Sequence, residues 1–383
     1  MLTRHGVVAL LAGVVAVGVG RVFAVLELFI IGTAFIAAAI FAVLFVNLRR
    51  PRITAARWIH PSVLVAGDTG RVDLNLHYLG SVRSTSFELC ETVAHPGTRD
   101  HIARLPVGSL RPGAQSSTGY QLPTSTRGLV HLGPLTVETR DPLGMALSSR
   151  VVADDDEVAV APRVVLLEMP ELGRGSLGNH LLNQARRLGT GDFHGLREYV
   201  DGDEPRSISW KASARSENLL VKEHTVEGLR RCTIALDTSP SGYQDAAGFE
   251  RGVSAAASLV YSADKAGLAT RFLTASDIDL RGPQVAGNTM RLLARLEPAA
   301  GTFDQLKHDP GDGLGLLVVI TGSKQSAGWK AIQSAVDPTV TALQVTTEER
   351  SSSSIGVSAR TDEEFLASWR SLTGRDQVHA AAS

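Results

Sequence analysis

The chain has 383 residues, more than one ordinary domain needs, and a formal net charge of -1. This charge balance argues against nucleic acid as a partner and against a disordered, strongly acidic chain. The only two cysteines, Cys90 and Cys232, exclude a disulfide framework and a multi-cysteine metal site, and they fit a reducing compartment.

Residues 1–50 predict a two-helix membrane anchor. Gly6 to Gly20 carries no charge, and Leu28 to Val46 is a second uncharged stretch close to the ~20 residues that span a hydrocarbon core. A secretory signal peptide is the alternative for the first stretch, but no A-x-A-like cleavage site precedes the second. Positive charges lie outside the hairpin at Arg4, Arg49, Arg50, Arg52 and Arg57. The positive-inside rule then places both ends and the soluble domains in the cytoplasm, with membrane lipid around the anchor.

Residues 51–163 predict a small β-sandwich. Val72 to Leu79 alternates apolar and polar residues with period two, after a Gly-Asp-Thr-Gly turn. The stretch from Arg127 to Gly144 repeats the alternation and is punctuated by Gly-Pro and Asp-Pro. Scattered acidic and histidine residues in this region are interpreted as surface and turn residues.

Residues 164–230 are expected to link two domains, and residues 231–375 predict an α/β domain. Val165 to Leu182 has no regular period. Apolar runs at 232–237, 269–275, 314–321 and 340–347 then alternate with helical stripes near 249–260, 290–296, 329–336 and 362–372. This alternation indicates a doubly wound parallel sheet. Residues 376–383 are expected to form a disordered tail.

The first strand of the α/β domain ends in a D-x-S-x-S loop, Asp237, Ser239 and Ser241. Ligands of such sheets lie at the carboxyl ends of the strands, and one carboxylate with two hydroxyls suits Mg²⁺ or Mn²⁺. The loop resembles the metal-ion-dependent adhesion site of von Willebrand A domains, and Thr289 precedes a predicted helix where those domains supply another hydroxyl. The fourth strand ends in Thr321-Gly322 without their acid. The alternative is a loop whose hydroxyls cap the next helix and whose aspartate accepts backbone N–H bonds.

Residues 189–223 mix charges with apolar anchors. One hypothesis makes His194, Glu198, Asp203 and His224 an acid–base site. The favoured hypothesis pairs Arg206 and Arg215 with Glu198, Asp201 or Asp203 to lock a seam between domains, with Ile208 and Trp210 packed inward.

The sequence from residue 196 to 215, LREYVDGDEPRSISWKASAR, is similar to domain-of-unknown-function-58 proteins. Their signature, G-D-x-x-R-x-I-x-W-x-x-S-A-R, is complete here. It comprises Gly202, Asp203, Arg206, Ile208, Trp210, Ser213, Ala214 and Arg215, and follows Arg197, Glu198 and Tyr199. The resemblance extends over essentially the whole chain and implies a membrane anchor, a β-rich region and a von Willebrand A-like domain.

The resemblance also implies a partner, a MoxR-type AAA+ ATPase, with which such proteins assemble, activate or insert metal into client proteins. The preferred function is therefore a non-enzymatic, membrane-anchored adaptor. Two alternatives stay open: a hydrolase or transferase that uses the acidic and histidine residues of the signature segment, and a structural protein of the envelope.

Overall fold

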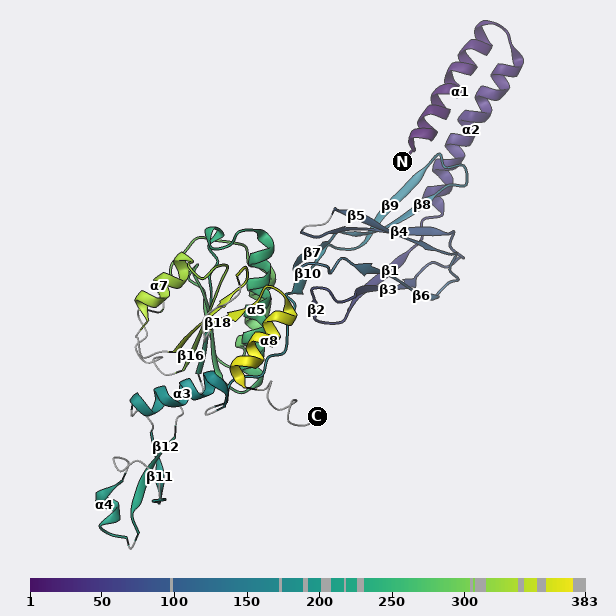
Figure 1. The fold of residues 1–383 in the computed structure, drawn as a ribbon. Helices are drawn as coiled ribbons and strands as arrows, with labels where there is room; N and C mark the ends of the chain where they lie inside the picture. Colours follow the sequence, from purple (N-terminus) through teal and green to yellow (C-terminus); the bar gives the residue numbers. More distant parts are fainter. Residues whose placement is uncertain are drawn as a thin grey trace, which may run out of the picture. The chain divides into compact units, whose positions relative to one another are not determined.

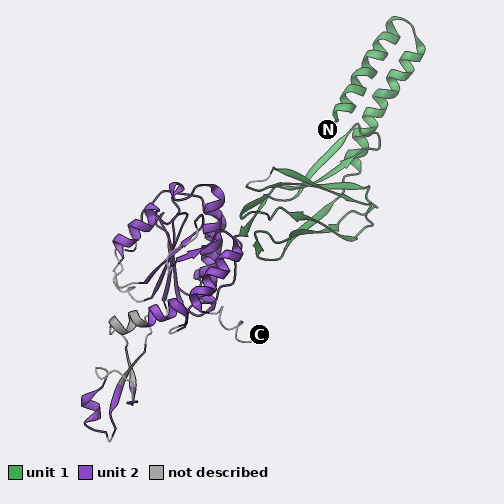
Figure 2. Cartoon of the chain, in the orientation of Figure 1, with its two compact units in different colours: residues 1–161 green, residues 162–383 purple. Residues whose placement is uncertain are grey.

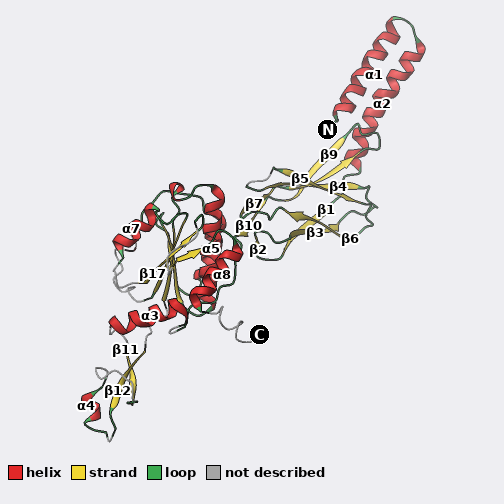
Figure 3. Ribbon diagram, viewed as in Figure 1, coloured by secondary structure: helices red, strands yellow, loops and turns green. Residues whose placement is uncertain are grey.

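A computed structural model gives the architecture of the chain (Figure 1). It describes residues 1–96, 99–171, 174–188, 192–200, 208–216, 218–225, 231–303, 306, 315–336, 341–349 and 356–374. The chain divides into two compact units, Met1–Ala161 and Pro162–Ser383 (Figure 2). The first combines a helical hairpin with β-strands, and the second mixes helices and strands (Figure 3). The predicted disordered tail lies outside the described residues.

The N-terminal hairpin consists of α1 (Arg4–Val22) and α2 (Leu26–Leu48), both long and apolar enough to cross a membrane. Glycines allow the two helices to approach closely. A Cβ built on Gly13 would lie 2.9 Å from the carbonyl oxygen of Gly32, and one on Gly32 would lie 2.7 Å from that of Gly13. Small residues at a helix contact are the usual device for close packing in lipid, where no hydrophobic effect drives helices together.

The β region of unit 1 consists of two sheets that share one core. The smaller has the order β1-β3-β6, and the larger has the order β2-β10-β7-β4-β8-β9 with β5 paired to β4. Their bounds are β1 Ile53–His60, β2 Leu64–Val65, β3 Gly70–Tyr78, β4 Phe87–Ala94, β5 His101–Val107, β6 Gln115–Leu122, β7 Gly128–Leu132, β8 Leu135–Arg140, β9 Leu147–Ala153 and β10 Asp156–Ala161. Leu74 of β3 and Leu89 of β4 are fully buried in the same cluster. The period-two pattern at Val72 correctly predicts β3, because every second side chain enters this core.

One charge expected to flank the membrane lies inside the β region instead. Arg57 on β1 is paired with the Glu91 carboxylate on β4, and Tyr120 on β6 donates to the same carboxylate at 2.7 Å. Arg57 therefore joins the two sheets and does not contribute a solvated charge at the membrane surface. The pKa of Tyr120 is raised by burial and by the hydrogen bond to Glu91.

The sheet of unit 2 has the order β15-β14-β13-β16-β17-β18, with all neighbours parallel except β15. Its strands are β13 Arg231–Leu236, β14 Ala269–Thr274, β15 Asp279–Arg281, β16 Leu316–Thr321, β17 Thr341–Thr346 and β18 Gly356–Ser358. The uninterrupted apolar run of β16 correctly predicts a strand buried on both faces, since every residue of it is buried. The short strands β15 and β18 have no sequence pattern of their own.

Helices cover both faces of this sheet. They are α3 Gly175–Leu188, α5 Ala246–Lys265, α6 Val285–Arg295, α7 Ala327–Ala335 and α8 Asp362–Thr373. The core on one face includes side chains of α3, α5, α6 and α8, and that on the other face includes Ile332 of α7. The expectation of an irregular stretch up to Leu182 is wrong, because α3 buries Leu177 and Leu181, one helical turn apart, in the main core. Ser176, in the first turn of α3, donates its hydroxyl hydrogen to the Leu372 carbonyl of α8 at 3.4 Å.

The signature segment contains an antiparallel hairpin, β11 (Asp192–Glu198) and β12 (Leu220–Thr225), with the short helix α4 (Trp210–Ser213) between them in sequence. Ile208 pairs with Val221 in an isolated bridge, and both are buried. The Ser213 hydroxyl accepts from the Leu220 backbone N–H at 2.8 Å, which holds α4 against β12.

Candidate functional site

The loop after β13 lies at the carboxyl edge of the parallel sheet, as the sequence predicts. The backbone N–H of Asp237 donates to the carbonyl of Ile320 on the neighbouring strand at 2.9 Å, which fixes the aspartate at the strand end. Pro240–Gly242 forms a single 3-10 turn, and α5 begins after Asp245. The N-cap of α5 is Asp245, whose carboxylate accepts from Gly248 N at 2.6 Å. The loop hydroxyls therefore do not cap α5, so this half of the alternative is wrong. Its other half, an aspartate that accepts a backbone N–H bond, is confirmed by the bond from Ser239 to Asp237.

The Asp237 carboxylate is buried, with 1% of the residue exposed. Its Oδ1 accepts from the backbone N–H of Ser239 at 3.0 Å, while Oδ2 has no hydrogen-bond partner. Burial raises the pKa of Asp237, and the hydrogen bond from Ser239 offsets part of this effect. A buried carboxylate oxygen without a partner costs free energy, and a cation or a donor reaching it would recover that cost.

Two glycines lie against this carboxylate. A Cβ built on Gly328, in the first turn of α7, would lie 2.4 Å from Asp237 Oδ2. A Cβ built on Gly242 would lie 3.0 Å from the same atom. Glycine at these two positions is therefore what lets the α7 terminus and the 3-10 turn close over the carboxylate. Neither glycine is expected from the sequence motif, because a motif on one loop contains no information about a neighbouring loop.

A second acidic residue reaches the same edge from the end of β17. Glu348 Oε1 accepts from Gln244 N at 2.5 Å, and Glu348 Oε2 is buried without a partner. The pKa of Tyr243 is raised well above its usual value, first by burial and then by the negative charges of Asp237 and Glu348. The Tyr243 hydroxyl donates to the backbone carbonyl of Asp237 at 2.7 Å. No sequence motif around Tyr243 or Glu348 predicts that these residues lie at the same sheet edge as Asp237.

The remaining residues of the predicted metal site are unequally placed. Ser239 is half-buried and Ser241 is exposed. Thr289 lies inside α6, four residues after its first residue, so the expectation that it precedes a helix is wrong. Its hydroxyl is buried without a partner, as is that of Thr238. The hydroxyl of Thr321 already donates to the Ser323 carbonyl at 3.0 Å.

These residues fit a divalent cation in part. Asp237 Oδ2 and the hydroxyl of Thr238 are buried oxygens in need of a partner, which suits a hard cation. The closure by Gly328 leaves little room at Oδ2, and the turn after β16 supplies no carboxylate. A cation here would therefore take further ligands from water or from another molecule.

Among the described signature residues, some make contacts within the hairpin and others are exposed to solvent. Ile208 and Ser213 hold the hairpin together, and the Tyr199 N–H donates to the Leu219 carbonyl at 2.8 Å. Trp210 is 66% exposed, so the expectation that it packs inward is wrong. Arg215 is exposed as well.

The seam and the acid–base hypotheses both depend on residues that the structure does not describe. Gly202, Asp203 and Arg206, together with Asp201, lie outside the described residues, as do the side chains of His194, Arg197 and His224. Glu198 is exposed and accepts from the Asn218 amide at 2.9 Å. Within the described part of the chain, Arg215 makes no ion pair.

The family model described as "Protein of unknown function DUF58" matches residues 195–323, from β11 to the turn after β16, and supports membership of that family. None of the curated proteins matches the chain. Among solved structures, β-glucosidase from Listeria innocua in complex with gluconolactone aligns at 13% identity, over 29% of this chain and 16% of that one, with a TM-score of 0.21. The Pseudomonas fluorescens alkylpurine DNA glycosylase AlkC bound to DNA aligns at 13% identity, over 34% and 39%, with a TM-score of 0.23. Likenesses at these TM-scores carry no argument about fold or activity.

Proposed function

We propose that this chain is a membrane-anchored adaptor that binds a MoxR-type AAA+ ATPase and acts with it in the assembly or activation of client proteins. The observation that carries the proposal is the exposure of Trp210 within the region that the family model matches. Large aromatic side chains are expensive to leave in water and dominate protein interfaces when they are covered. Leu196, Val200 and Leu219 on the same hairpin are exposed too.

The α/β domain supplies a second surface in this proposal. Its strand order, with the motif strand β13 at the centre and one antiparallel strand at the edge, is consistent with a von Willebrand A-like domain. The D-x-S-x-S loop then forms the partner-facing edge. An acidic side chain of the partner would complete the coordination of Mg²⁺ or Mn²⁺ at Asp237, replacing the carboxylate that is missing after β16.

In this proposal the adaptor works on the cytoplasmic side of the membrane. AAA+ ATPases need ATP, so the β region of unit 1 and the whole of unit 2 would lie in the cytoplasm, with α1 and α2 in the lipid. Arg49, Arg50 and Arg52 follow α2 and remain the flanking charges that favour this orientation, whereas Arg57 is half-buried and paired with Glu91, so it no longer counts.

The test is binding of the full-length protein, reconstituted in lipid nanodiscs, to a purified MoxR-type AAA+ ATPase. Trp210→Ala should weaken binding about tenfold or more, because a hot-spot residue typically contributes ~2 kcal/mol or more. The matched control is Trp58→Ala, since Trp58 on β1 is 58% exposed but lies in the other unit. Absence of binding by the wild type would refute the adaptor function. Equal binding of all three proteins would refute the role of the hairpin.

The cation is tested separately by calorimetric titration of the full-length protein with Mg²⁺ or Mn²⁺, with and without the ATPase. The wild type should bind the ion and Asp237→Ala should not. Identical titrations for the two proteins would exclude a cation at this loop.

A further inference from the structure

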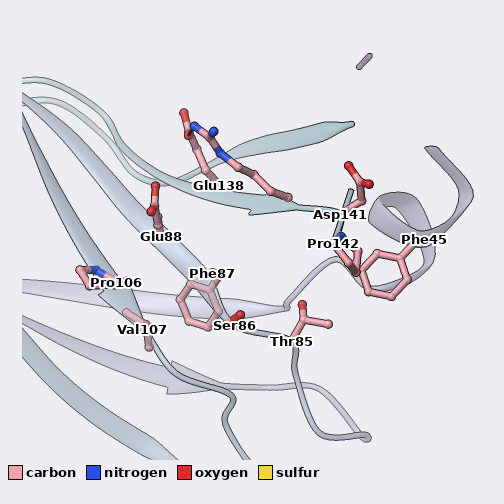
Figure 4. A pocket seen from close by; sticks show the side chains of 11 residues that line it. Phe45, Thr85, Ser86, Phe87, Glu88, Pro106, Val107, Glu138, Asp141 and Pro142 are labelled. Atoms are coloured by element: carbon pink, nitrogen blue, oxygen red, sulfur yellow. Dashed lines mark ion pairs between the residues drawn. The ribbon is translucent and has the colours of Figure 1, made fainter. Parts of the chain in front are cut away.

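A pocket of about 590 Å³ lies in unit 1 beside the last turn of α2 (Figure 4). Phe45 of α2 and Pro142 of the loop after β8 line one part of it. Glu88 of β4 and Glu138 and Arg140 of β8 line another. The lining is therefore part apolar and part charged, with both signs of charge.

Contacts between the helical hairpin and the β8–β9 loop fix the position of the pocket relative to α1 and α2. Val46 of α2 and Ala146 of the β8–β9 loop are buried against each other. The Met1 ammonium donates to the Leu147 carbonyl, and Thr3 N donates to the Met145 carbonyl, each at 2.8 Å. With α2 in the membrane, as proposed, the pocket would lie where its uncharged run ends, at the level where hydrocarbon gives way to lipid head groups.

The charges in the pocket are poorly satisfied by one another. Glu88 and Glu138 are directly opposite on the antiparallel strands β4 and β8, an arrangement that is unfavourable for like charges. Arg104 of β5 lies 3.6 Å from Glu88 and 3.5 Å from Glu138, and Arg140 lies 3.8 Å from Glu138.

Charge-assisted hydrogen bonds are normally about 2.7–2.9 Å long. The bond from Arg271 to Asp279 in unit 2 has this length, at 2.8 Å. The looser pairing leaves two pocket carboxylates, Glu88 and Glu138, able to accept hydrogen bonds and the pocket guanidinium of Arg140 able to donate them. A ligand that carries an ammonium group beside an anionic group would satisfy both.

We propose that this pocket binds the head group of a zwitterionic phospholipid that has a primary ammonium, of the phosphatidylethanolamine type. The ammonium donates to Glu88 and Glu138, and the phosphate accepts from Arg140. Phe45 and Pro142 contact the apolar part of the lipid next to the head group. The bound lipid then holds the β region in one orientation on the membrane surface. This inference rests on the proposed membrane anchoring.

A metal ion is the competing occupant of the same charges. Glu88, Cys90 and Glu138 each offer one ligand atom, and these three atoms lie within 4.8 Å of one another. Arg104 lies 3.6 Å from the sulfur of Cys90, the one ligand of the three that a metal would need and the ammonium would not. Burial and the Glu138 charge also raise the pKa of the Cys90 thiol, which disfavours the thiolate that a metal needs.

The experiment is native mass spectrometry of the full-length protein released from nanodiscs that contain equal amounts of phosphatidylethanolamine, phosphatidylcholine and phosphatidylglycerol. The wild type should retain phosphatidylethanolamine about tenfold better than phosphatidylcholine, whose quaternary ammonium has no N–H donor; tenfold corresponds to ~1.4 kcal/mol. Glu88→Gln with Glu138→Gln should abolish this preference, and Arg140→Gln should weaken retention of both zwitterionic lipids.

The control is Glu157→Gln, which removes an exposed carboxylate of the same sheet that pairs with His131. It should leave lipid retention unchanged. The glutamine variants remove a repulsion between facing strands, so they are expected to fold, and thermal unfolding in detergent checks this.

Three results would overturn the proposal: equal retention of phosphatidylethanolamine and phosphatidylcholine, unchanged retention by the double glutamine variant, or displacement of the lipid by Zn²⁺ in wild type but not in Cys90→Ser. Alkaline carbonate extraction separates this failure from failure of the anchor. A chain that stays in the membrane but shows no lipid preference sinks only the pocket assignment, and a chain that is extracted sinks the anchoring.

Discussion

Gly328→Ala tests whether α7 closes over the Asp237 carboxylate. Alanine normally stabilises a helix relative to glycine by about 0.5–1 kcal/mol. Here the new Cβ would lie 2.4 Å from Asp237 Oδ2 and 2.8 Å from its Cγ, so the helix or the loop must move. Overpacking of this kind typically costs about 1–3 kcal/mol, which reverses the sign of the substitution. For a unit of this size each kcal/mol corresponds to roughly 2–4 °C in melting temperature.

The matched control is Gly287→Ala in the first turn of α6, where a Cβ would meet nothing within 4 Å. Thermal unfolding of the detergent-solubilised chain should show Gly287→Ala slightly stabilised and Gly328→Ala destabilised. Hydrogen exchange in α7 should rise only in the second variant. Adding Asp237→Ala to Gly328→Ala removes the atoms in the way and should recover most of the loss. If Gly328→Ala gains stability as Gly287→Ala does, the carboxylate is not covered and the reasoning fails.

Three further changes test other features of the structure. Burial raises the pKa of Asp237, so the stability that this carboxyl group contributes is fully present below the ordinary aspartate pKa and is lost as pH rises through the raised pKa. Asp237→Asn should flatten that decline when melting temperature is measured against pH. Arg57→Met leaves the buried Glu91 charge without its partner and should cost about 3–5 kcal/mol in thermal unfolding, most of it recovered by adding Glu91→Gln; a loss below ~1 kcal/mol would contradict a buried pair. Gly32→Val should push α1 and α2 apart and speed proteolysis of the hairpin in detergent, whereas Gly18→Val, with open space around it, should not.

Local patterns in the sequence predict much of the fold for a physical reason. The hydrophobic periods of β3 and β16 follow directly from which side chains enter a core, so the strand type can be read from a few residues. The uncharged run that becomes α2 is long enough to span hydrocarbon, which composition alone reveals. The Asp237 loop lies at the carboxyl edge because it directly follows a strand of the parallel sheet.

The errors arise where a residue is placed by partners distant in sequence. The sequence predicts that Trp210 packs inward, yet in the described part of the hairpin Ile208 and Val221 are buried while Trp210 is exposed. The sequence also places Arg57 among the membrane-flanking charges, but Arg57 pairs with Glu91, on a strand of the other sheet. Nothing local distinguishes these residues from their exposed or buried counterparts.

The sequence by itself therefore determined the apolar helical hairpin, the β region, the parallel sheet and the position of the D-x-S-x-S loop, because each depends on composition, on periodicity or on adjacency along the chain. Tertiary structure alone decided the state of the sites. Gly328 and Gly242 close over Asp237, Glu348 reaches the same edge from another strand, and Glu88 faces Glu138 near the end of α2. These contacts join residues tens of positions apart, and only the folded chain brings them within reach of one another.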